Sequence, residues 1–153
     1  STDASSRPST QGDCESVMPM RILTTIMFIV LIAGCTQTAP VQPGQHVLKS
    51  NDNDFILHWS ARPTPIPVND FFEIDVLLLD HHGNPLTDAQ LHVDAAMPQH
   101  RHGMNHRSHM ESLGDGRWRA EDMLFHMPGA WVLYFDVTQD DVVRRAQVDV
   151  EVD

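Results

Sequence analysis

Short segments that alternate apolar and polar residues dominate the chain between Phe55 and Val152. The last segment is the clearest, because Ala146, Val148 and Val150 alternate with charged or amide side chains. Successive side chains of a strand point to opposite faces, so this pattern is typical of strands with one buried face. Turn-forming residues separate the segments, and the sequence therefore predicts an all-β antiparallel sandwich of about six to seven strands. The predicted strands span 55–59, 71–79, 89–96, 118–125, 131–137 and 142–152.

The core of this sandwich has to be held together without a disulfide. Cys14 and Cys35 are the only cysteines, and both precede the strand-forming region. That region therefore offers no thiolate to a metal, and its stability has to come from buried apolar side chains. We expect Trp118 and Trp131 to be core aromatics.

The N-terminal part of the chain has the composition of a leader segment. Residues 1–19 are polar, and we interpret them as a pre-segment outside the mature protein. Residues 20–34 place Arg21 before an apolar run of about a dozen residues that ends in small side chains, which is typical of a signal peptide. The run is shorter than the roughly 20 residues of a spanning helix. A short buried helix is the alternative.

Leu31 to Cys35 (LIAGC) resembles the lipobox of bacterial lipoproteins, which implies that Cys35 is lipidated and begins the mature chain. Residues 35–50 follow as a proline-containing tether, and residues 51–153 form the folded domain. The predicted protein is extracytoplasmic and anchored to the lipid membrane through Cys35. Thr36 after the cysteine favours the periplasmic face of the outer membrane, if the source has two membranes.

Charge and motif content exclude several functions. The chain has 10 basic and 21 acidic residues, a formal net charge of −11, so no basic face is available for a nucleic-acid partner. No Ser-His-Asp order, paired catalytic carboxylates, glycine-rich phosphate loop or His-Glu-x-x-His spacing occurs in the sequence. We therefore expect a protein that is not an enzyme.

Residues 97–110 concentrate potential metal donors. These fourteen residues carry four imidazoles and three thioethers, and Met123, His126 and Met127 form a second group downstream. Imidazole suits several transition metals, whereas thioether favours copper as Cu(I). Zinc remains possible through the imidazoles alone. The favoured ligands are Met97, His100, His102, Met104, His126 and Met127, with His106, His109 and Met110 as a weaker auxiliary set.

The expected geometry of this site rests on an extended segment. His100 and His102 would point to one side of it, Gly103 would permit a turn toward Met104, and His126 would approach from a neighbouring strand. Each donor also has an ordinary structural interpretation: methionines fill core gaps, and His126 could hydrogen-bond a loop carbonyl. The scattered histidines, which we expect at the surface or in turns, are His46, His58, His81, His82 and His92.

Four features together resemble the YtkA-like and FixH-like extracytoplasmic domains. They are the turn at Asp80–Leu86, the Met-Pro and His-x-His-Gly-Met of Met97–Met104, Gly114–Trp118, and Phe125–Trp131. The resemblance covers about 100 residues, and residues 97–104 are its most specific part. It implies an immunoglobulin-like sandwich that acts as a binding module, with no established reaction. It also implies a copper-handling or respiratory-enzyme partner protein.

Two functional hypotheses follow from these observations. The first is a membrane-anchored lipoprotein that binds copper through its Met/His loop for buffering or delivery. The alternative is a non-catalytic tethered interaction or assembly module, in which the histidines are incidental or bind zinc.

Overall fold

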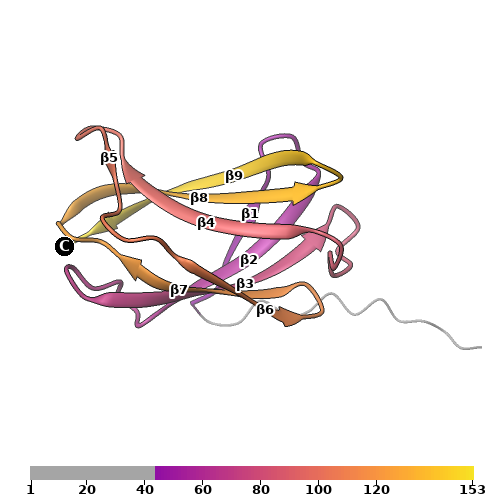
Figure 1. The fold of residues 1–153 in the computed structure, drawn as a ribbon, viewed down its shortest axis with the longest axis horizontal. Coiled ribbons are helices and arrows are strands. Elements are labelled where there is room, and N and C mark those ends of the chain that lie inside the picture. Colours follow the sequence, from indigo (N-terminus) through magenta and orange to yellow (C-terminus); the bar gives the residue numbers. More distant parts are fainter. Residues whose placement is uncertain (1–43) are drawn as a thin grey trace, which may run out of the picture. The chain divides into compact units, whose positions relative to one another are not determined.

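The computed structural model describes residues 44–153, which belong to the second compact unit of the chain, Thr36–Asp153. This range contains nine strands and no helix (Figure 1). The strands are β1 (His46–Lys49), β2 (Phe55–Arg62), β3 (Phe71–Asp80), β4 (Gln90–Met97), β5 (His102–Gly103), β6 (His109–Gly114), β7 (Arg117–Leu124), β8 (Gly129–Gln139) and β9 (Val142–Val152).

The strands form two antiparallel sheets packed face to face. One sheet has the order β1-β2-β3-β7-β6, and the other has the order β5-β4-β8-β9 (Figure 1). The predicted all-β sandwich is confirmed, but it has nine strands instead of six to seven. The three additional strands, β1, β5 and β6, all lie at sheet edges. An edge strand pairs on one side only, so a short segment with little apolar alternation can form it.

The core is made by the inner faces of both sheets, as the alternation predicts. Ile74 and Val93 are fully buried, whereas the residues directly before and after each of them are more exposed. Trp131 is also fully buried, and its ring stacks on Phe125 at a centroid distance of 4.4 Å. Trp118 is 8% exposed, so the expectation of two core tryptophans is confirmed.

The sandwich begins earlier than the sequence suggested. Residues His46–Lys49, which we assigned to the tether, pair with β2 as an edge strand, with His46 opposite Trp59. Only Leu48 of this strand is half-buried, which explains why its sequence carries no strong strand signal. The predicted pre-segment, the signal peptide, Cys35 and the tether as far as residue 43 lie outside the described residues. Within residues 44–153, no helix is long and apolar enough to cross a membrane.

Candidate metal centre

The first half of the donor-rich stretch forms a tight hairpin. Met97 at the end of β4 pairs with His102 of β5, and residues 98–101 connect them. The His100 amide donates to the Met97 carbonyl at 3.0 Å, and Arg101 has a positive φ of 58°. The expectation of an extended segment at His100 and His102 is therefore wrong. The turn nevertheless leaves their ring centroids 5.7 Å apart.

Gly103 has a different role from the turn that we expected. It lies in β5 opposite Ala96, and a Cβ atom there would lie 3.3 Å from the Ala95 carbonyl oxygen. The Met104 amide donates to the same oxygen at 3.1 Å. Glycine thus allows a close approach of the two backbones, and the reversal occurs at Arg101. Met104 continues alongside β4, half-buried against the core.

His126 reaches this hairpin from the connection between β7 and β8. It follows β7, and its ring centroid lies 5.0 Å from that of His102 with the planes at 40°. Both rings contact the Trp131 ring, at centroid distances of 6.0 Å for His102 and 5.4 Å for His126. The sandwich therefore brings two imidazoles separated by 24 positions in the sequence into one cluster.

The hydrogen-bonding state of these two rings suits them as ligands. The His126 Nδ1 atom is buried and has no hydrogen-bond partner in the described part of the chain. An unpartnered buried polar atom is rare and costs free energy, so it calls for a specific explanation. His102 Nδ1 lies 3.1 Å from the Gly103 carbonyl oxygen. When that nitrogen carries the proton, Nε2 keeps a free lone pair, which is the usual arrangement of a metal-binding histidine.

Met97 and Met127, two of the predicted sulfur donors, lie in different environments. Met97 is only 2% exposed and belongs to the core, so its packing role is established, whatever its role as a ligand. Its Cε atom would lie 3.1 Å from a Cβ placed on Gly129. Met127 is half-buried, and its carbonyl accepts a hydrogen bond from Trp131 Nε1 at 3.0 Å. Trp131 thus fixes the segment that carries His126.

The auxiliary donors lie in other surroundings. The exposed His106 contacts the ring of Phe71 at 5.2 Å. His109 is exposed on β6 opposite Glu121, whereas the neighbouring Met110 is half-buried against the core. Among residues 44–153, no ring contact connects His106 or His109 with the cluster, and no group of three or more His, Cys, Asp or Glu side chains is arranged to hold a metal.

Two residues were missed or misplaced by the sequence interpretation. Trp131 was expected in the core but not beside the histidines. His58, expected at the surface, is only 5% exposed and its Nδ1 has no partner in the described residues. It is flanked by Val47 of β1 and Leu77 of β3, so recognition of β1 as a strand would have revealed its burial. The histidines found exposed as expected are His46, His81, His82 and His92.

Comparisons with known proteins are consistent with this architecture. A comparison with curated proteins finds no match. The fold is similar to the crystal structure of a DUF4426 family protein from Pseudomonas aeruginosa PAO1, with a TM-score of 0.50 and 12% sequence identity. That similarity covers 72% of this chain and 95% of the other, and it concerns the fold alone. A family model described as YtkA-like matches residues 49–136, which is more than half of the sequence. The chain therefore belongs to the YtkA-like family.

Proposed function

We propose that the domain binds one copper ion, as Cu(I), through His102 and His126 together with methionine sulfur, and that it buffers or delivers this ion outside the cytoplasm. The observation that carries the proposal is the contact between these two imidazoles, at 5.0 Å between ring centroids, combined with the buried and unpartnered Nδ1 of His126. A bound metal would engage lone pairs that the protein itself leaves unused.

The surrounding donors favour copper over zinc. Thioethers are soft ligands that select Cu(I), whereas structural zinc sites prefer thiolate and imidazole. Met97, Met104 and Met127 all pack against the core around the hairpin and the segment after β7. His100 sits in the exposed turn, 5.7 Å from His102 between ring centroids, where it is accessible to a partner protein. We assign His100 to the entry and release of the ion.

The proposed role is non-catalytic and tied to a membrane. Cys35 would carry the lipid, and the segment before β1 would hold the domain away from the bilayer. A copper-handling protein or a respiratory enzyme would exchange the ion with the exposed side of the hairpin. These points rest on the LIAGC motif and on the donor chemistry of the cluster.

The decisive experiment is a Cu(I) titration of the full chain in competition with a chromophoric chelator. Cys14 and Cys35 are first changed to serine, because free thiolates would bind Cu(I) themselves. We expect one ion per chain. Loss of an outer-shell partner alone lowers metal affinity by about 10–100-fold, so His102→Ala or His126→Ala should each weaken binding by at least about tenfold.

The matched control is His92→Ala, because His92 is exposed on β4 and makes no ring contact with the cluster. It should leave the affinity unchanged. Absence of Cu(I) uptake by the cysteine-free chain, or equal losses in the cluster and control variants, would contradict the proposed site. The tethered interaction module would then be the better account.

A further inference from the structure

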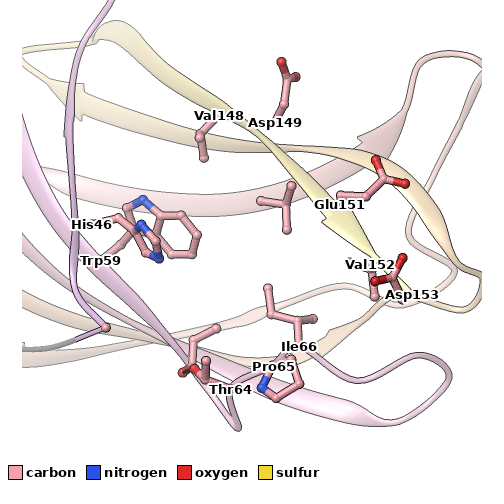
Figure 2. A pocket seen from close by; sticks show the side chains of 13 residues that line it. His46, Trp59, Thr64, Pro65, Ile66, Val148, Asp149, Glu151, Val152 and Asp153 are labelled. Carbon is pink, nitrogen blue, oxygen red and sulfur yellow. Dashed lines mark hydrogen bonds between the residues drawn. The ribbon is translucent and has the colours of Figure 1, made fainter.

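A second candidate site lies at the edge of the sandwich that β9 forms. β8 separates this edge from β4. A cavity of about 430 Å³ separates the end of β9 from β1, β2 and the loop after β2 (Figure 2). Trp59, Ile66 and Val148 contribute apolar surface to it. The His46 ring stacks on Trp59 at 4.6 Å and extends the aromatic wall. This volume lies within the range of about 300–1,000 Å³ that ligand pockets have.

The backbone of β9 is unpaired beside this cavity. β9 is the outer strand of its sheet and pairs only with β8 in the described part of the chain. The Asn51 amide donates to the Arg145 carbonyl at 2.9 Å, so the Arg145 backbone points away from β8. Backbone groups alternate in direction along a strand. Gln147, Asp149 and Glu151 therefore also direct their N–H and C=O groups to the free edge.

The side chains of β9 alternate in register with these backbone groups. Val148 and Val152 lie on the cavity side, whereas Asp149 and Glu151 point away from it (Figure 2). Asp153, which also borders the cavity, is a third carboxylate at this edge. Within residues 44–153, no ion pair engages these three acids. The nearby arginines are occupied elsewhere, since Arg144 pairs with Asp54 and Arg145 pairs with Asp136.

We propose that this edge binds an extended peptide segment of a partner protein, in which apolar and basic residues alternate. The peptide pairs its backbone with Gln147–Glu151 and adds a strand to the sheet, while its apolar side chains enter the cavity and its basic ones meet the acids of β9. Main-chain hydrogen bonds give affinity in this mode, and pockets for alternate side chains give specificity. The acidic edge selects the sign of the partner's charge.

The test measures binding of a fluorescent synthetic peptide that alternates valine and lysine to the full chain, by fluorescence anisotropy. A peptide that alternates valine and glutamate is the control for charge, and it should not bind. Glu151→Pro removes one donor from the free edge without touching a β8 hydrogen bond, so the fold should tolerate it. Loss of a hydrogen bond of about 1 kcal/mol corresponds to affinity weakened by about fivefold.

A further variant with two substitutions keeps the backbone intact. Asp149→Asn with Glu151→Gln retains both amides, and it should weaken binding and remove most of its salt dependence. Failure of the valine-lysine peptide to bind, or unchanged affinity in all these variants, would overturn the proposal. So would a stable dimer of the unmodified chain that Glu151→Pro dissociates, because a second copy would then occupy the edge. The His102→Ala variant should bind the peptide normally, so this result is independent of the metal proposal.

Discussion

The ring centroids of His102 and His126 lie 5.0 Å apart, with His102 in β5 and His126 in the connection from β7 to β8, which links the two sheets. His102 is held by a hairpin whose register pairs it with Met97, and His126 lies two residues after the end of β7. Trp131 contacts both rings and anchors the His126 segment through the Met127 carbonyl. The spacing of the two histidines therefore depends on the β4–β5 hairpin and on the β7–β8 connection that Trp131 anchors.

Removal of the thioethers should separate copper from zinc. Met97 is buried, so Met97→Ala would create a cavity and cost about 2–5 kcal/mol of stability, whereas Met97→Leu conserves volume and should cost less than about 1.5 kcal/mol. We expect Met97→Leu with Met104→Leu to weaken Cu(I) binding by more than tenfold (about 1.4 kcal/mol) and to leave Zn(II) binding nearly unchanged. Parallel chelator competitions measure both. An equal loss for the two ions would argue against sulfur ligands.

The turn before β7 should tolerate a methyl group at one glycine and not at the other. Gly114 and Gly116 both have positive φ, of 80° and 70°, but a Cβ on Gly116 would lie 2.6 Å from the Leu78 carbonyl oxygen, whereas one on Gly114 meets nothing within 4 Å. Gly114→Ala should cost about 1–2 kcal/mol of unfolding free energy from the backbone conformation alone. Gly116→Ala should cost more.

Chemical denaturation of the two glycine variants measures the difference directly. The Leu78 amide also donates to the Gly116 carbonyl at 2.8 Å, so the backbones cannot separate without loss of a buried hydrogen bond. Equal destabilisation by the two substitutions would mean that this close approach is not what requires glycine.

At acidic pH, Asp80 in the turn after β3 should lose the contribution that its carboxylate makes to the stability of the fold. Hydrogen bonds from the Asn84 side chain, then the Asn84 amide, and then the His82 amide hold the pKa of Asp80 below its ordinary value of 3.8. The folded state therefore favours the ionised carboxylate. The contribution of the ionised Asp80 to the free energy of unfolding is fully present above pH 3.8. It is lost as the pH falls through the lower pKa that Asp80 has in the folded state.

The Asp80→Asn variant tests this contribution. It should be less stable than the parent chain at neutral pH, and the difference should shrink below about pH 4. Urea denaturation midpoints between neutral and acidic pH measure both effects. Asp149→Asn is the control, since the Asp149 carboxylate accepts no hydrogen bond within the described range and should change little. A constant difference across the pH range would contradict the assignment to Asp80.

Fatty-acid labelling tests the predicted anchor. Cys35→Ala should abolish incorporation of labelled palmitate in the expressing cells and move the protein from the membrane fraction to the soluble extracytoplasmic fraction, because Cys35 is the proposed attachment point of the lipid. Cys14→Ala serves as the control and should retain the label. Labelling that persists without Cys35 would contradict the lipoprotein assignment.

Sequence alternation predicted the central strands well because their burial is one-sided. Phe72, Ile74 and Val76 are buried as expected between the more exposed Glu73 and Asp75. The edge strands escaped prediction, since β6 has a single half-buried residue and β5 has only two residues. Such strands are stabilised by the neighbour with which they pair, and their own sequence carries little signal.

The candidate site was predictable in composition and not in geometry. The concentration of histidine and methionine in residues 97–110, followed by His126, indicated the candidate donors from composition alone. The reversal at Arg101 depends on the pairing of Met97 with His102, which is a tertiary contact, and a non-glycine residue at positive φ gives no local sequence signal. The separation of His106 and His109 from the cluster likewise follows from which sheet receives β6.

The segment between Gly103 and His109 crosses from one sheet to the other, where the hydroxyl of Ser108 donates to the Val93 carbonyl at 2.5 Å. The donors on either side of this crossing come together only after β4 has paired with β8 and β3 has paired with β7. In the proposed metal-binding role, a newly made chain would therefore lack a complete set of ligands until β8 has been synthesised and the two sheets have packed together. Ion capture by the folded form would then withdraw molecules from the unfolded pool, so metal supply would control how much of the protein survives proteolysis.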